Sequence, residues 1–234
     1  KSDPENQYFI QTLATRISKR YLPNDAQPEK GPPHRVINDL CYGNDGKIYL
    51  ATPLGLSIFD PETETFEHIR PDESSNMPSF SLLAAAGADL VIASDQGIFR
   101  YEYAQKSFRH YKHDSSAKSP RSDEINCLLV DSKGRLWIGF DEGLDFQVHK
   151  DSGFQHIELS PFVEDLPVNA LVEDLKGEIW VATDKEIIRY LPNKKAAYFF
   201  NEKDGLPLFS YNCAAKDLSG KLYFGGTQGV ISFS

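Results

Sequence analysis

The sequence predicts an all-β protein, a β-propeller of five four-stranded blades, and two observations predict it. One six-residue pattern recurs without a gap, with successive starts 42, 46, 43 and 43 residues apart, at 46–51, 88–93, 134–139, 177–182 and 220–225. A glycine follows nine residues after the opening slot in four of these copies, with Glu186 as the exception. A unit of about 43 residues that repeats with polar links is typical of blades around an axis.

Each copy is expected to form four short strands. The first alternates apolar and polar residues, as in 125–130, and ends in a tight turn where Gly134 can adopt a positive φ. The second follows at once and is apolar on both faces, as expected for a strand covered by neighbouring blades. The recurrent glycine starts the third strand, and the fourth carries Phe-x-His in three copies. The internal period of two residues excludes a helical solenoid.

The predicted domains are an N-terminal segment, 1–33, and a propeller, 34–234, whose repeats start near residues 34, 78, 123, 166 and 209. The fifth copy reaches Ser234 after its third strand, so we expect segment 16–22 to complete the last blade and protect its edge. The alternative is a partial arc of a larger propeller. Residues 5–15 equally fit a short helix after Asp3 and Pro4, and 22–33, with four prolines, reads as a connector.

Composition excludes several classes of protein. The net charge of -9 repels a phosphate backbone, so nucleic acid is not an expected partner. No apolar stretch approaches the roughly 18 residues needed to cross a bilayer. The start at Lys1 without a leader fits either an untargeted protein or one whose signal or anchor was removed. Cys41, Cys127 and Cys213 show no metal-binding spacing and are expected to be small buried residues, and no cofactor is predicted.

The repeat resembles a known family. The pattern apolar-Asn-x-apolar, then Asp-x-x-Gly-x-apolar-Trp-apolar-Gly/Ala, then Gly and an aromatic is similar to the two-component regulator propeller repeat. It is clearest in 125–146 and 168–190, and the Asp-Gly-Leu-Pro link at 204–207 also fits. The resemblance covers 34–234. It implies a periplasmic or extracellular input domain of a sensor, anchored through a longer protein, whose ligands are poly- or oligosaccharide fragments.

The chain also departs from that family. Such sensors generally carry more than five blades, and this sequence shows no transmembrane helix, no three-Tyr linker domain and no kinase. A signalling role is therefore implied only by the resemblance to this family.

A ligand is expected at the hub, where the links between blades and the turns between second and third strands gather. The first strands open with amides that can read sugar hydroxyls, although such amides also cap nearby backbone. Acidic and polar side chains on the same rim would suit a neutral or cationic ligand, or a hard metal ion, although such turn residues are also commonly solvated. The predicted ligand-binding residues are Asn38, Phe80, Asn126, Asn169, Asn212, Asp95, Asp141, Glu142, Asp184 and Gln228.

The expected function is non-catalytic sensing of a small-molecule or oligosaccharide ligand. A glycosidase needs two carboxylates about 5 to 9.5 Å apart, whereas the slot after the amides supplies only Asp39. The best enzymatic alternative is a lyase or glycosidase that uses Asp141 with Asp184. A third alternative is a protein-interaction platform on the apolar link 77–80, where Phe80 would otherwise stack on a sugar. A homodimer is left open.

Overall fold

A computed structural model of the chain describes residues 19–71, 77–159, 166–206, 211–227 and 229–233. These residues form five antiparallel sheets, four with four strands and the last with three, in which consecutive strands pair. We name the sheets blade 1 to blade 5. Blades 1 and 2 are β1 (Asp39–Tyr42), β2 (Ile48–Thr52), β3 (Gly55–Asp60), β4 (Thr65–Ile69), and β5 (Phe80–Ala86), β6 (Asp89–Ser94), β7 (Gly97–Glu102), β8 (Ser107–Tyr111).

The remaining blades repeat this order. Blade 3 is β9 (Cys127–Val130), β10 (Leu136–Phe140), β11 (Gly143–Gln147) and β12 (Gln155–Ile157). Blade 4 is β13 (Ala170–Glu173), β14 (Ile179–Ala182), β15 (Ile187–Leu191) and β16 (Ala196–Phe200). Blade 5 is β17 (Tyr211–Lys216), β18 (Leu222–Gly226) and β19 (Gly229–Phe233). Two short 3-10 helices, η1 (Pro28–Lys30) and η2 (Glu202–Asp204), lie outside the sheets.

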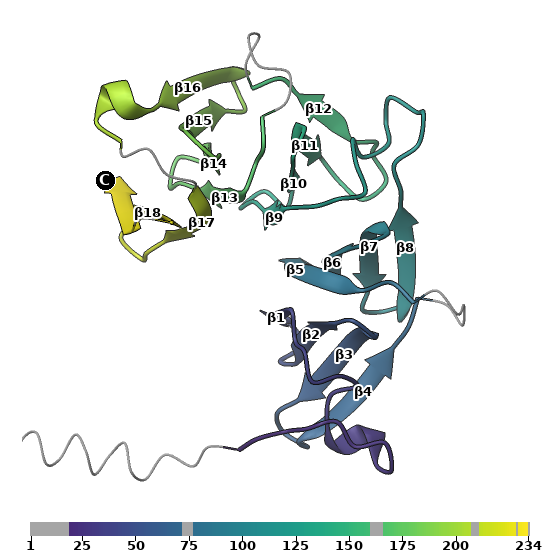
Figure 1. Cartoon of the computed structure of the whole chain (residues 1–234). Coiled ribbons are helices and arrows are strands. Elements are labelled where there is room, and N and C mark those ends of the chain that lie inside the picture. The colour runs from purple at the N-terminus through teal and green to yellow at the C-terminus, as the bar shows by residue number, and fades with distance from the viewer. Residues whose placement is uncertain (1–18, 72–76, 160–165, 207–210, 228, 234) are drawn as a thin grey trace, which may run out of the picture.

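The blades stand side by side in an arc with their first strands innermost (Figure 1). Each inner strand contacts the next one along the arc, β1 with β5, β5 with β9, β9 with β13, and β13 with β17. This arrangement confirms the predicted all-β propeller class. Figure 1 also shows that the arc stays open between blade 5 and blade 1.

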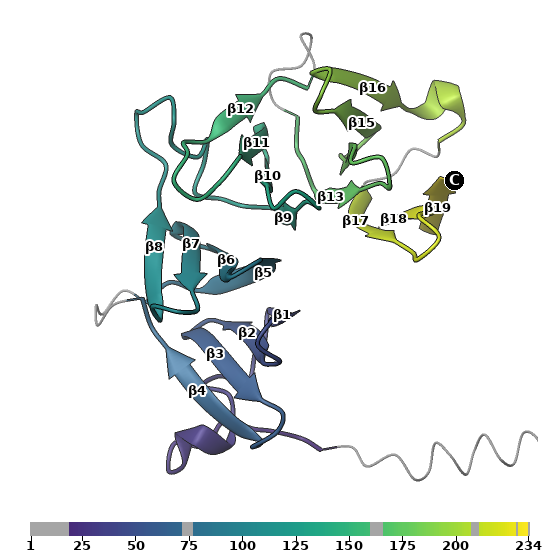
Figure 2. The same cartoon turned by 180° about the vertical axis from the view of Figure 1, so that it is seen from behind.

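The N-terminal segment does not close the arc in the part that the structure describes. The Tyr21 ring packs on blade 1, 4.9 Å from the ring of Phe59 and 5.4 Å from that of Phe66. Next to it η1 lies against β4, where Pro28 O is 3.0 Å from Nε2 of His68 (Figure 2). The prediction that 16–22 completes the last blade is therefore wrong for its described residues, 19–22. The expected helix over 5–15 lies outside the described residues.

Hydrogen bonds between a carboxylate and an aromatic side chain fix the first turn of four blades. In each case an aspartate before or within the turn accepts a bond from the aromatic residue of the second strand. The donor and acceptor atoms are 2.9 Å apart for Tyr49 and Asp45, 2.8 Å for Trp137 and Asp131, 3.0 Å for Trp180 and Asp174, and 3.0 Å for Tyr223 and Asp217. The recurring aspartate is thus part of the blade framework.

The same aromatic side chains pack onto the following blade. Trp137 is 1% exposed, with its ring 5.9 Å from that of Tyr190 in blade 4. Trp180 lies 6.4 Å from Phe224 and 5.1 Å from Phe233 in blade 5. Apolar clusters of this kind lie between neighbouring blades along the arc. Burial between sheets, more than within them, therefore holds the arc together.

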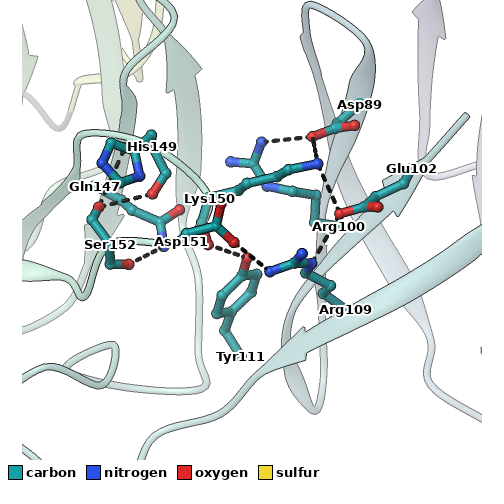
Figure 3. Close-up of polar contacts among 10 residues, drawn as sticks. All are labelled: Asp89, Arg100, Glu102, Arg109, Tyr111, Gln147, His149, Lys150, Asp151 and Ser152. Atoms are coloured by element: carbon teal, nitrogen blue, oxygen red, sulfur yellow. Dashed lines mark hydrogen bonds and ion pairs between the residues drawn. The ribbon is translucent and has the colours of Figure 1, made fainter.

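A network of ion pairs ties blade 2 to blade 3 (Figure 3). Lys150, in the turn after β11, places Nζ 2.9 Å from Glu102 and 3.5 Å from Asp89. Arg109 of β8 contacts Glu102 at 2.9 Å and Asp151 at 2.7 Å. The hydrogen bond from Lys150 lowers the pKa of Glu102, against an opposing effect of burial. These charges neutralise one another across the junction, so we assign them a structural role.

Candidate functional site

A hollow of about 470 Å³ lies among the inner strands of blades 2 to 5. We call it the hub hollow. It brings together four of the predicted site residues from three blades, because the inner strands converge there. Its lining residues are Ser81, Leu82, Ile125, Asn126, Asn169, Asp184 and Asn212.

Backbone pairing fixes the position of two of these amides. The backbone N–H of Asn126 donates to Gly139 O at 2.9 Å, and that of Asn169 donates to Ala182 O at 2.9 Å. Each asparagine is therefore held where its inner strand begins to pair with the second strand. The repeated register explains why chemically equal side chains reach the hub from two neighbouring blades.

Each of the two amides also donates to an aspartate at the equivalent position of its own blade. Asn126 Nδ2 donates to Asp141 Oδ1 at 2.7 Å, and Asn169 Nδ2 donates to Asp184 Oδ1 at 2.8 Å. The aspartates come from the turns between second and third strands. The oxygens of both amides and of both carboxylates are hydrogen-bond acceptors, so the hub presents mainly acceptors. Such a surface suits a ligand rich in O–H or N–H donors.

The other predicted asparagines have different positions. Asn38 Nδ2 donates to Phe80 O at 2.7 Å, so this amide links blade 1 to blade 2 and does not line the hollow. Asn212 lies at a bulge in β17 between Tyr211 and Cys213 and does line it. Gln228 lies outside the described residues.

The prediction that Phe80 contacts the ligand is wrong. Its side chain is 0% exposed and packs 5.5 Å from the ring of Phe99 and 6.2 Å from that of Phe108. It can offer no stacking surface to a sugar. Pro78 is buried as well, so the link 77–80 is not the exposed apolar patch that an interaction platform would need.

A shorter first turn explains this error. Four residues separate Ala85 from its partner Leu90 in blade 2, whereas five separate Val130 from the equivalent Leu136 in blade 3. Ser81, and not Phe80, therefore takes the position that asparagine holds in the next blades. Its hydroxyl donates to Ala93 O at 3.2 Å. An alignment on the apolar residue that precedes each asparagine would have placed Phe80 with Val168, and this was the available signal.

The remaining acidic candidates are partly engaged in the framework. Asp95 Oδ1 accepts from Ser79 N at 2.9 Å. The Glu142 side chain is exposed, while its backbone oxygen accepts from Arg121. Asp39 Oδ2 accepts from Leu83 N at 2.7 Å, which ties blade 1 to blade 2. The single carboxylate that the sequence placed at the inner slot is therefore a structural link.

The structure gives no indication of a metal centre in the ranges it describes. No group of three or more His, Cys, Asp or Glu side chains there could hold an ion. The recurring histidines contact their own blades: His68 lies 3.1 Å from Ser57, His156 2.8 Å from Asp145, and the His110 ring stacks on Phe99 at 4.0 Å.

The cysteines differ from one another. Cys213 is exposed, so its predicted burial is wrong, whereas Cys41 and Cys127 are partly covered. Cys127 Sγ lies 3.6 Å from Val168 O in blade 4, and burial raises the pKa of its thiol to about 12. Cys213 lies on the face of blade 5 that turns away from blade 4, where no described strand covers it.

Comparison with known families identifies the repeat. Residues 119–142 match the family described as two component regulator propeller. Residues 119–142 carry one two-component regulator propeller repeat. The matched segment includes Asn126, Asp131, Trp137 and Asp141, so both the framework bond and one amide–carboxylate pair of the hub belong to this repeat. No curated protein sequence matches the chain significantly.

Solved structures similar to the chain are propellers. An extracellular domain assigned to a one-component system of B. thetaiotaomicron aligns with a TM-score of 0.68 and 18% identity, over 85% of this chain and 26% of that one. PorZ, a surface component of the type-IX secretion system of Porphyromonas gingivalis, aligns with a TM-score of 0.72 and 18% identity, over 92% of this chain and 34% of that one. The virginiamycin B lyase of Staphylococcus aureus aligns with a TM-score of 0.64 and 10% identity, over 94% of this chain and 74% of that one.

These similarities bear on the fold. The chain spans only 26% and 34% of the lengths of the first two structures. No helix within the described ranges has the length and apolar character needed to cross a membrane.

Proposed function

We propose that the chain is a non-catalytic, ligand-sensing propeller of a periplasmic or extracellular receptor, and that its hub hollow recognises a poly- or oligosaccharide fragment. One observation carries the proposal: Asn126–Asp141 and Asn169–Asp184 repeat the same pair in adjacent blades, and both amides line one hollow. Its volume of about 470 Å³ is in the range of small-ligand sites. The similarity to extracellular sensor domains supports the location.

Sugar hydroxyls match the chemistry of the hub. Each hydroxyl supplies one donor, and the amide oxygens and carboxylates of the two pairs accept such donors at fixed positions. The carboxylates Asp141 and Asp184 disfavour an acidic sugar and favour a neutral or cationic one. With Phe80 buried, recognition rests on hydrogen bonds, so we expect dissociation constants between about 10 μM and 10 mM.

An enzymatic function is the second candidate, because a lyase is among the similar structures. Asp141 and Asp184 would have to act as its acids. Each already accepts an amide hydrogen bond from its own blade, which holds it as an acceptor. Turnover of an oligosaccharide by the parent protein, lost in Asp141→Asn, would favour this candidate over a sensor.

Glycan binding tests the proposal directly. The chain is screened for ligands by thermal shift and on a glycan array. Light scattering separately tests whether it forms a homodimer. We expect Asn126→Ala and Asn169→Ala each to weaken a hit about fivefold to tenfold. Asn193→Ala, an exposed asparagine in the β15–β16 turn, is the matched control. Undiminished binding by the double variant would refute the hub as the site.

A further inference from the structure

A second hollow, of about 430 Å³, lies between blades 4 and 5. We call it the junction hollow. It is built from the first turns of both blades, together with side chains of β14, β15, β18 and β19. Its lining residues are Asp174, Leu175, Lys176, Trp180, Arg189, Ser219, Gly220, Lys221, Leu222 and Phe233.

The junction hollow lies at the opposite edge of the blades from the hub hollow. In blade 4 the turn with Asp174 precedes β14, and the turn with Asp184 follows it. A strand of four residues spans about 13 Å, so the two turns are at opposite ends of the sheet. A ligand in one hollow therefore does not touch the other.

The neighbouring junction shows why this hollow is open. Between blades 3 and 4, Ser132 donates twice to Glu173, from N and from Oγ, each at 2.7 Å. Between blades 4 and 5, Leu175 is equivalent to Ser132, because each directly follows the turn aspartate. Lys216 is equivalent to Glu173, because each ends its inner strand in the same register. Leucine and lysine cannot form that clamp.

The loss of the clamp leaves apolar surface accessible. Leu175 is 72% exposed, and Trp180 is 8% exposed against 1% for Trp137 at the clamped junction. The Trp180 ring stacks on Phe200 at 5.6 Å and lies 5.1 Å from Phe233. The hollow thus has a rigid aromatic and aliphatic wall.

Its rim carries excess positive charge in an acidic protein. Lys176 and Lys221 line it, and neither ammonium forms an ion pair within the described ranges. The Lys221 ammonium lies over the ring of Tyr223, 5.6 Å from its centroid. Arg189 is paired with Glu178. The lining carboxylate, Asp174, accepts bonds from Trp180 Nε1 at 3.0 Å and from Lys176 N at 2.8 Å. A single negative charge on a ligand would find the Lys176 ammonium without an ion-pair partner among the described residues.

We propose that the junction hollow binds a small organic carboxylate whose body is an apolar ring. The ring would pack against Trp180, Phe233 and Leu175, and the carboxylate would lie beside Lys176. The volume admits one such ring, and the site needs no residue of the hub hollow. It is a ligand site separate from sugar recognition.

Tryptophan fluorescence measures this binding. The chain has 2 tryptophans, of which Trp180 lines the hollow and Trp137 lies at the clamped junction. The probe is cyclohexanecarboxylate, which does not absorb in the tryptophan range. We expect a saturable change in emission. Cyclohexylmethanol, which lacks the charge, and acetate, which lacks the ring, should bind at least about tenfold more weakly.

Two pairs of variants locate the effect. Leu175→Ser with Lys216→Glu restores the clamp of the neighbouring junction and should abolish the change in emission. Lys176→Gln should weaken binding roughly threefold to tenfold, whereas Lys133→Gln, its equivalent in the turn of blade 3, should not. If the clamp variant fails to fold, the difference in affinity between Lys176→Gln and Lys133→Gln tests the proposal.

Emission that changes linearly without saturation, equal affinity for cyclohexylmethanol, or equal effects of Lys176→Gln and Lys133→Gln would each exclude a carboxylate site here. Asn169→Ala should leave the emission change intact, so failure of the hub site and failure of the junction site are distinguishable.

Discussion

The indole N–H of Trp137 donates a 2.8 Å hydrogen bond to the buried carboxylate of Asp131, and the same carboxylate accepts from Arg135 Nε at 2.6 Å. Both donors would be left without this acceptor in Asp131→Ala. We expect that variant to lose about 3 kcal/mol of unfolding free energy in urea titration. A loss below about 1 kcal/mol would contradict a framework role.

The equivalent aspartate of blade 4 makes stability depend on pH. Burial alone would raise the pKa of Asp174, but hydrogen bonds from Trp180 and from the backbone of Glu178 and Lys176 outweigh it and lower the pKa. A depressed pKa in the folded state stabilises the fold above the unfolded-state pKa, and this contribution disappears as pH falls through the folded-state value. We expect the stability difference between the parent and Asp174→Asn to shrink from about pH 5 to about pH 2. A difference that is constant with pH would contradict the assignment.

Phe80 should affect stability and not ligand contact. Because the side chain is fully buried against Phe99 and Phe108, Phe80→Ala removes a large core group, at a cost of about 3 to 5 kcal/mol. Tyr42→Ala, at a side chain that is 69% exposed, should change stability by no more than about 0.5 kcal/mol. Chemical denaturation of the two variants side by side checks this. Similar costs would argue against the burial of Phe80.

Cysteine labelling distinguishes the exposed thiol from the covered one. Cys213 is exposed, whereas burial raises the pKa of Cys127 to about 12, which keeps its thiol protonated near neutral pH. We expect maleimide to modify Cys213 at least about 100 times faster than Cys127 at pH 7.5. Mass spectrometry of Cys213→Ser and Cys127→Ser variants assigns the two rates. Equal rates would show that the junction of blades 3 and 4 opens readily.

Much of the blade architecture was predictable from the sequence, because Gly134 and Trp137 recur with their neighbours in a fixed register that admits few folds. Asn126 and Asn169 were likewise placed at the hub by that register. The register failed at Phe80, because the first turn of blade 2 is one residue shorter than that of blade 3. The position of Tyr21 could not be predicted either, because its contacts with blade 1 depend on tertiary packing and not on local periodicity.

The side chains of the hub hollow come from consecutive members of a repeat array, blades 2 to 5. In such an array each unit contacts only its neighbours. A molecule that spans Asn126, Asn169 and Asn212 would connect three units at once, so its binding would be registered as slower amide exchange in their inner strands.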